Sequence, residues 1–248
     1  MTMIEQNKKR WWIEIAVVLA AAWLVPMLNA FASFTAGLRW DAGPSTHGPG
    51  NSNAIELAFQ TATSLQTIAP VLYIMWISRR WVDFGVIRLR VLRDPGVAVL
   101  IGVGTLIVYW ILAWLLYAAA DALDFSGYWL DAQSSHNWTT ITSDDVVPAA
   151  GPPLVSLLAM LVANSFAEEF VFRGVLLERL TRVLGSVHAG VWVSSLLFAS
   201  YHMYQGAYGL VSALSLGVLA AYSMRLTKSI WPCVIAHTVM NVLIFAMA

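Results

Sequence analysis

The chain has 248 residues, of which 59% are hydrophobic and 11% are charged, with a formal net charge of zero and a mean hydropathy of +0.69. Because a soluble domain of this length carries about 25% charged residues, this composition excludes an ordinary soluble domain and indicates a polytopic membrane protein. We expect the lipid bilayer among its partners, and no nucleic acid.

Long apolar runs follow one another along the chain. A membrane-spanning helix requires about 20 predominantly apolar residues. We therefore predict an all-α, polytopic transmembrane helix bundle that forms a single integral membrane domain over 1–248. It contains about seven spans, with six or eight as alternatives, at 11–34, 55–78, 96–120, 153–172, 188–203, 207–226 and 229–247.

The basic residues predict the orientation of these spans. Of the 14 Lys and Arg residues, 13 precede the first span or lie in every second loop, whereas the loop at 121–150 contains five Asp and no Lys or Arg. The positive-inside rule places the N-terminus in the cytoplasm and, with seven spans, the C-terminus outside. The apolar run after Lys8-Lys9-Arg10 is longer than the about 7–15 residues of a signal-peptide core, so we expect an uncleaved first span.

Two adjacent glutamates, Glu168 and Glu169, interrupt the apolar run that begins at Leu154. A carboxylate in a membrane helix costs ~2.5 kcal/mol or more and by default marks a functional site. Residues four apart share a helix face, whereas adjacent residues are ~100° apart. We therefore predict that Glu169 pairs with Arg173, and that Glu168 faces elsewhere without a local partner. In the alternative interpretation the helix leaves the membrane here, and both glutamates are interfacial charges.

Polar residues recur in two later spans. His202 ends the short span at 188–203, and His237 and Asn241 lie one turn apart in the last span. Taken alone, His202 is explained as well by an interfacial histidine as by a functional role. His237 and Asn241 are explained as well by a polar contact between helices. Together with Glu168 they predict a hydrolytic site, because a carboxylate and a histidine can take a proton from water. A histidine and an asparagine can donate hydrogen bonds to the developing oxyanion.

These residues alone leave open whether the site requires a metal. Glu168, His202 and His237 could instead ligate zinc and leave a fourth position open. The single cysteine, Cys233, excludes a disulfide within the chain and a cysteine-cluster metal site. The chain has no His-Glu-x-x-His, no Gly-x-Ser-Gly and no paired membrane aspartates, so other intramembrane protease chemistries fit less well.

Three segments resemble the motifs of the CAAX-protease and bacteriocin-processing family, also called the Abi family. These are Glu168-Glu169-Phe-Val-Phe-Arg173, Phe198-Ala-Ser-Tyr-His202 and His237-Thr-Val-Met-Asn241. They match the patterns Glu-Glu-x-x-x-Arg, Phe-x-x-x-His and His-x-x-x-Asn in the order of the family. The resemblance covers about 150–247, with a looser similarity at 83–88.

The resemblance implies an α-helical intramembrane endopeptidase with its site in the cytoplasmic half of the bundle. Carried over by position, Glu168 and His202 would activate the attacking water. His237 and Asn241 would stabilise the oxyanion. Residues 151–248 would then form the catalytic core, and 1–150 would provide scaffold spans.

Glu169 and Arg173 would shape the site of such an enzyme. We favour a glutamate-type protease without a cofactor over a zinc metalloprotease, because side chains fill both the base and the oxyanion roles. The substrate class is a peptide or a membrane-anchored protein. Eukaryotic members of the family remove the last three residues after a prenylated cysteine, whereas many bacterial members are tied to peptide maturation, bacteriocin self-immunity or surface-protein processing.

The short loops and the absence of a targeting tail favour a bacterial inner membrane. The sequence predicts no oligomeric state. The alternative function is a non-catalytic membrane protein, either a proton-coupled transporter with Glu168 as a proton relay or an assembly or immunity scaffold. The chain shows no two-fold repeat and no pair of Gly/Pro-broken helices, which many transporter folds contain.

Overall fold

The computed structural model describes residues 3–24, 27–28, 31, 69, 72, 89–123 and 154–247. Every element in these segments is helical and none is a strand, which confirms the all-α prediction for the described part of the chain. The span predicted at 55–78 lies outside these segments except for two single residues. The segment at 83–88 and most of the loop at 121–150 also lie outside them.

The N-terminal helix α1 (Met3–Val18) continues into a π-helical segment, η1 (Leu19–Trp23). The helix begins before the apolar run predicted at 11–34, because the charged residues of its first turns have long unbranched side chains with high helix propensity. Its end is attached to α9 (Val187–Ser200). The Trp23 indole donates to the carbonyl oxygen of Leu197 at 2.9 Å and to Ser200 Oγ at 3.2 Å.

One continuous helix carries the two adjacent glutamates. α7 (Leu154–Glu169) passes into the π-helical segment η3 (Phe170–Leu176) and then into α8 (Leu177–Leu184), and both junctions keep right-handed helical dihedral angles. This helix ends at Gly185, whose φ of 69° is the left-handed conformation that glycine adopts without strain. The span predicted at 153–172 is therefore the first part of a longer helix. A π-helical segment inside a helix frequently marks a functional site.

After the turn at Gly185 the chain returns along α8 as α9. The hydroxyl of Ser186 caps α9 by accepting a hydrogen bond from the backbone N–H of Ala189 at 3.3 Å. Gly190 lies so close to Thr181 that a Cβ atom there would overlap with it, so glycine allows the close packing of α9 on α8. The short turn η4 (Met203–Gln205), α10 (Gly206–Thr227) and α11 (Trp231–Met247) follow.

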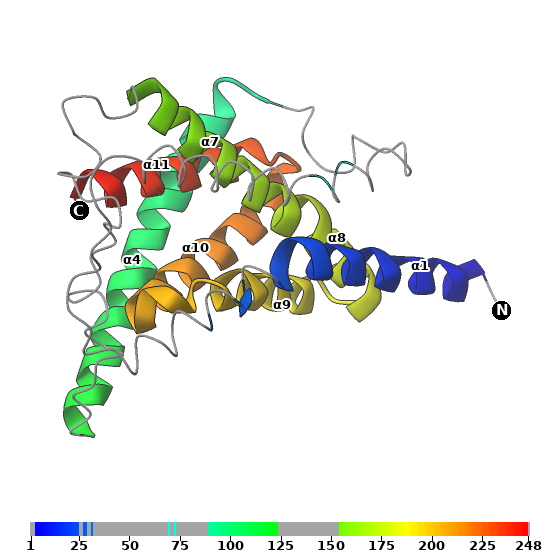
Figure 1. The fold of residues 1–248 in the computed structure, drawn as a ribbon, viewed down its shortest axis with the longest axis horizontal. Helices are drawn as coiled ribbons and strands as arrows, with labels where there is room; N and C mark the ends of the chain where they lie inside the picture. Colours follow the sequence, from blue (N-terminus) through cyan, green and yellow to red (C-terminus); the bar gives the residue numbers. More distant parts are fainter. Residues whose placement is uncertain are drawn as a thin grey trace, which may run out of the picture.

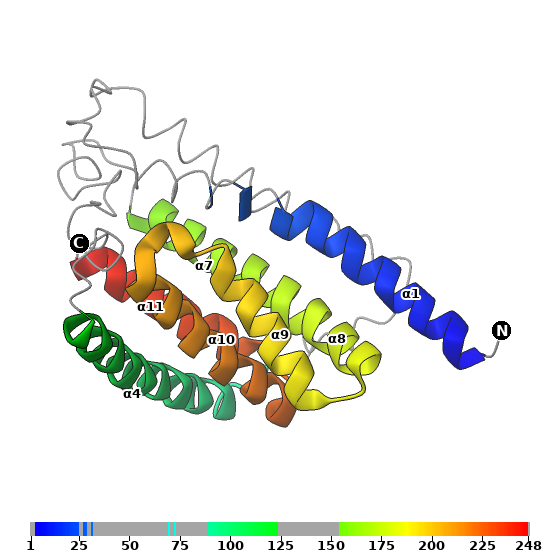
Figure 2. The ribbon, with the colours of Figure 1, turned by 90° about the horizontal axis from the view of Figure 1, so that it is seen from below.

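The helices α7 to α11 form the centre of the molecule, and α4 (Arg93–Ala122) crosses α11 obliquely (Figure 1). Figure 2 shows α1 and α4 on opposite sides of this central group. α1 packs on α8, whereas α4 packs on α10 and α11. One apolar core includes Val18 of α1, Ile101 of α4 and Phe170 of η3. The described helices of the first half therefore pack directly on the second half.

Two of the described helices, α4 and α10, are long and apolar enough to cross a membrane. α9 and the segment Trp231–Leu243 are also apolar, but they are shorter. The outward side of α4 is apolar as well, with Leu100 72% exposed and Trp110 69% exposed, as expected for a helix in contact with lipid. The predicted number of about seven spans stays a prediction.

Glu178 of α8 has both carboxylate oxygens paired. Oε1 accepts a hydrogen bond from Arg182 at 2.7 Å, and Oε2 accepts one from Arg225 of α10 at 2.6 Å. Burial raises the pKa of Glu178, but the hydrogen bond from Arg182 and the charges of Arg182, Arg225 and Lys228 outweigh burial and lower this pKa below its ordinary value. The carboxylate thus stays ionised and ties α8 to α10.

Two further acidic side chains are fully paired in the same way. Glu14 accepts from Arg10 and from Arg179 of α8, each at 2.9 Å. Asp94, at the start of α4, accepts from the Ser229 hydroxyl at 2.8 Å, and its other oxygen accepts from Arg93 at 2.7 Å. We call the following residues the peripheral network: Arg10, Glu14, Arg93, Asp94, Glu178, Arg179, Arg182, Arg225 and Ser229.

Candidate active site

The predicted site lies where the α7–η3 helix packs against α11. Two hydrogen bonds join these helices. Asn241 Nδ2 donates to Ser165 Oγ at 3.2 Å, and one turn further along His237 Nδ1 donates to Glu169 Oε1 at 2.9 Å. Each helix contributes residues four apart, in opposite chain order, so the two helices run antiparallel here. Polar residues at helical spacing therefore fix the register of the pair.

Glu169, Arg173 and His237 form a buried charged group. Glu169 Oε1 lies 3.1 Å from Arg173 Nη1, so the ion pair predicted from the i,i+4 spacing is present. The side chains of Glu169 and Arg173 are 0% and 1% exposed, which contradicts the interpretation of Glu169 as an interfacial charge. The guanidinium carbon of Arg173 lies 4.2 Å from the centre of the Phe198 ring. This cation–π contact holds the cation in an apolar environment.

Glu168 approaches the other nitrogen of the same imidazole. Its Oε2 lies 3.7 Å from His237 Nε2, and its Oε1 accepts a hydrogen bond from Asn164 Nδ2 at 2.8 Å. The expectation that Glu168 lacks a local partner is therefore wrong, because Asn164, one turn earlier, donates to it. The two ring nitrogens lie on separate edges of the imidazole, so carboxylates that diverge on one helix can flank one ring.

His202 enters the site from the end of α9. Its Nδ1 donates to the backbone carbonyl of Phe198 at 2.9 Å. The Phe198 ring centre lies 4.8 Å from that of His202 and 5.8 Å from that of His237, so both imidazoles pack against one phenyl ring. Phe198 has no predicted role beyond its motif position, yet its ring contacts both histidines and Arg173.

Both histidines donate their Nδ1 proton to an oxygen, to Phe198 O in one case and to Glu169 Oε1 in the other. In the neutral rings of His202 and His237 the lone pair therefore lies on Nε2. This tautomer suits the acceptance of a proton from water, and it also suits metal coordination. Among the described residues, however, no three His, Cys, Asp or Glu side chains are grouped as a metal site. The choice between a metal-free and a zinc site stays a prediction.

Several buried polar atoms of the site make no hydrogen bond to the described residues. They are Glu168 Oε2, Glu169 Oε2, Arg173 Nη1 and Arg173 Nη2. Buried polar groups without partners are costly, and in native proteins each calls for a specific explanation such as a catalytic role. Cys233 is also buried. It differs from them because its Sγ donates a hydrogen bond to the carbonyl oxygen of Ala220 at 3.3 Å.

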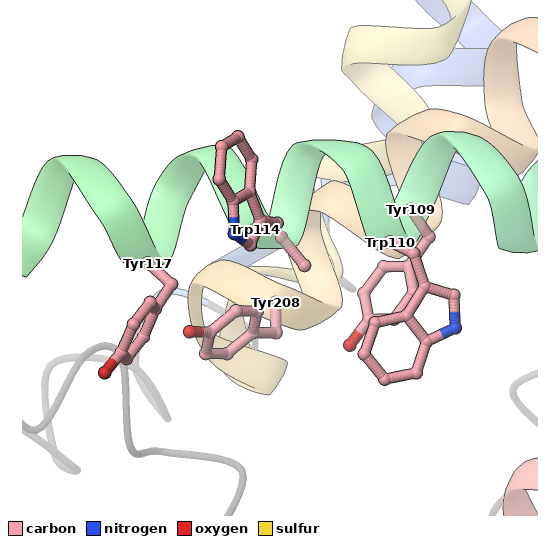
Figure 3. A pocket seen from close by; sticks show the side chains of 6 residues that line it. Tyr109, Trp110, Trp114, Tyr117 and Tyr208 are labelled. Atoms are coloured by element: carbon pink, nitrogen blue, oxygen red, sulfur yellow. The ribbon is translucent and has the colours of Figure 1, made fainter.

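A pocket of about 370 Å³ lies on α4 and α10, and none of the six predicted site residues lines it. Figure 3 shows Tyr208 of α10 beside the aromatic side chains of α4. Its lining is Tyr109, Trp110, Ala113, Trp114, Tyr117 and Tyr208. Trp and Tyr are enriched where membrane helices meet the aqueous interface. The pocket is therefore a feature separate from the polar site.

One comparison with known proteins covers the residues of this site. No curated protein and no solved structure matches the chain. The model of one family, described as type II CAAX prenyl endopeptidase Rce1-like, matches residues 150–243. The matched segment contains all three motifs. The family resemblance is therefore confirmed for residues 150–243, the part of the chain that is similar to the Rce1-like type II CAAX prenyl endopeptidases.

Proposed function

We propose that this protein is an intramembrane endopeptidase that hydrolyses a peptide bond in a membrane-associated peptide or protein. The observation that carries this proposal is the opposition of Glu168 Oε2 and His237 Nε2 across 3.7 Å, in a buried group that matches the motifs of an endopeptidase family. A carboxylate and an imidazole that face one another without a direct hydrogen bond can hold a third, reacting molecule.

The attacking water would bind between these groups. A separation of 3.7 Å exceeds the limit of a direct hydrogen bond, whereas a water beside the line between the two atoms can reach both. Glu168 would accept the proton of this water as it attacks the scissile carbonyl, and it would return the proton to the amine that leaves when the C–N bond breaks. His202 would assist in removing this proton from the water.

His237 and Asn241 would stabilise the oxyanion. Because His237 already donates its Nδ1 proton to Glu169, it can donate to an oxyanion only from Nε2, as an imidazolium. Asn241 has a second Nδ2 proton besides the one donated to Ser165, and this proton is available for the same oxygen.

Glu169 and Arg173 would act by orientation. Glu169 fixes the tautomer and the direction of the His237 ring, and Arg173 holds Glu169. The relation resembles the third member of a catalytic triad, which orients the histidine without exchanging its own proton. Because side chains fill both the base and the oxyanion roles, no step of this proposal uses a metal.

The substrate and the location are further parts of the proposal. A C-terminal sequence after a prenylated cysteine is the first substrate to test, since the matched family is described by that activity. The membrane would be a bacterial inner membrane with the N-terminus of the protein in the cytoplasm, as the basic residues predict.

Peptide cleavage by the purified protein tests the proposal. The wild type in proteoliposomes is incubated with a farnesylated peptide that ends in Cys-aliphatic-aliphatic-X and with its unprenylated form, and mass spectrometry identifies the products. We expect one internal cut that Glu168→Gln abolishes without loss of folded protein. Absence of cleavage, together with proton-dependent solute uptake that Glu168→Gln abolishes, would instead indicate a transporter.

A further inference from the structure

We infer that Asn164 and Ser165, one helical turn before the two glutamates, are positioning residues: Asn164 for the Glu168 carboxylate and Ser165 for the Asn241 carboxamide. This inference rests on the proposed endopeptidase activity. Neither residue belongs to the three motifs. Both belong to α7, and each lies four positions before one of the glutamates, so the pair repeats the geometry of Glu168 and Glu169 one turn earlier.

Asn164 restricts the base. A glutamate side chain rotates about several bonds, whereas a general base must be held within hydrogen-bonding reach of the water. The hydrogen bond of 2.8 Å from Asn164 Nδ2 fixes Glu168 Oε1, and this leaves Oε2 as the oxygen directed to His237 Nε2. A carboxamide is suited to this task, because its NH₂ group donates to the carboxylate without adding a charge to a buried site.

Ser165 restricts the oxyanion donor on α11. Its side chain is buried at 0% exposure, and its Oγ accepts one Nδ2 proton of Asn241 at 3.2 Å. With one proton bound, the amide plane of Asn241 is fixed and the second proton has a defined direction. Catalytic groups must be held to within about 0.5 Å of their productive geometry by such supporting contacts. Asn164 and Ser165 therefore support both parts of the site, the base and the oxyanion donor.

The variants that test this inference distinguish the effect of side-chain shape from the effect of the hydrogen bond. Asn164→Leu keeps the approximate volume and removes the donor, whereas Asn164→Gln keeps a donor on a longer side chain. Ser165→Ala removes the acceptor. Its matched control is Ser215→Ala, which removes a buried hydroxyl of α10 that contacts the carbonyl of Val211 and no site residue. Cleavage of the farnesylated peptide is measured for each, together with thermal unfolding in detergent.

We expect Asn164→Leu and Ser165→Ala to lower kcat by about tenfold with KM changed less than about twofold, because the reacting groups, and not substrate binding, lose their orientation. Asn164→Gln should recover most of the rate, and Ser215→Ala should have wild-type kcat. Equal losses of kcat in Ser165→Ala and Ser215→Ala would overturn the role of Ser165. Unchanged kcat in Asn164→Leu would overturn that of Asn164.

Double-mutant cycles then identify the residue through which each position acts. The cycles are measured on the unfolding temperature, because Glu168→Gln leaves no cleavage to compare. Asn164→Leu should add little to Glu168→Gln, and Ser165→Ala should add little to Asn241→Ala, whereas the crossed combinations should be additive. Additivity within the two pairs would contradict the inference. These cycles need no substrate, so they decide whether the contacts couple even if the wild type cleaves no peptide, a result that would overturn only the proposed function.

Discussion

Glu168 and Glu178 are both glutamates on the long helix α7–η3–α8, yet their surroundings differ. In the peripheral network, Glu178 has one Arg on each carboxylate oxygen. In the site, Glu168 has one oxygen bound to Asn164 and the other without a hydrogen bond to the described residues. Glu169 beside it is likewise paired at only one oxygen.

This difference separates a structural use of charge from a functional one. Where every oxygen is paired, as in Glu14 and Glu178, the carboxylates join helices and nothing further is needed to explain them. Unfilled hydrogen-bonding capacity in a buried position costs stability, and proteins retain such costs at functional sites. The peripheral network therefore joins the helices, and we propose that the polar group around His237 is the part adapted for chemistry.

The largest effect should follow from removing Glu169. Glu169→Ala leaves the buried Arg173 guanidinium without its counter-ion, and breaking a buried pair in this way costs ~3–5 kcal/mol. We expect a large fall in the unfolding temperature and no cleavage. The double variant Glu169→Gln with Arg173→Met should regain much of the stability but none of the activity. Recovery of activity in it would show that the pair does not orient His237.

His202→Gln should have the next largest effect, on the rate alone. His202 is half-buried at the end of α9, and its replacement removes a ring that can take part in proton transfer. General acid–base groups contribute about 10²–10⁴-fold, so kcat should fall by at least about 100-fold, while the unfolding temperature changes by only a few degrees. If the unfolding temperature of His202→Gln falls strongly while its folded fraction cleaves at the wild-type rate, His202 has a structural role and no catalytic one.

A smaller effect is expected in the peripheral network. Arg225→Met removes the cation from Glu178 Oε2, and partly exposed ion pairs contribute about 1 kcal/mol or less. The unfolding temperature should fall by a few degrees, and cleavage should remain within about twofold of the wild type. Arg225→Lys keeps the charge and serves as the control. Loss of cleavage in a folded Arg225→Met protein would contradict the separation of the peripheral network from the polar group around His237.

The smallest effect is a pH dependence of stability. Because the folded-state pKa of Glu178 is lowered, its carboxylate contributes stability that is fully present above the unfolded-state pKa and is lost as the pH falls through the folded-state pKa. Thermal unfolding from pH 7 down to about 3 should therefore show a steeper loss in the wild type than in Glu178→Gln. Parallel curves would contradict this contribution.

The sequence predicted those contacts that depend on spacing within one helix. The pair of Glu169 and Arg173 follows from the i,i+4 rule, and it forms even though η3 begins between them. The same rule applied to Asn164 and Glu168 would have identified the local partner of Glu168, because an Asn one turn before a Glu is a recognisable signal.

Contacts between helices could not be predicted in the same way. That His237 lies between Glu168 and Glu169, and that Ser165 accepts from Asn241, depends on the rotation and register of α7 against α11. Apolar composition alone predicts that helices pack, not which faces meet. The π-helical segment η3 was also missed, since it interrupts the regular periodicity from which the span at 153–172 was read.

The most direct measurement compares Glu168→Gln with Glu178→Gln. Both replace a glutamate of the same long helix with its neutral isostere, and both are assayed in proteoliposomes for peptide cleavage and in detergent for thermal unfolding. Our account predicts that Glu168→Gln loses cleavage and keeps or gains stability, whereas Glu178→Gln keeps cleavage and loses stability. Cleavage by a folded Glu168→Gln protein at the wild-type rate would contradict the assignment of Glu168 as the base.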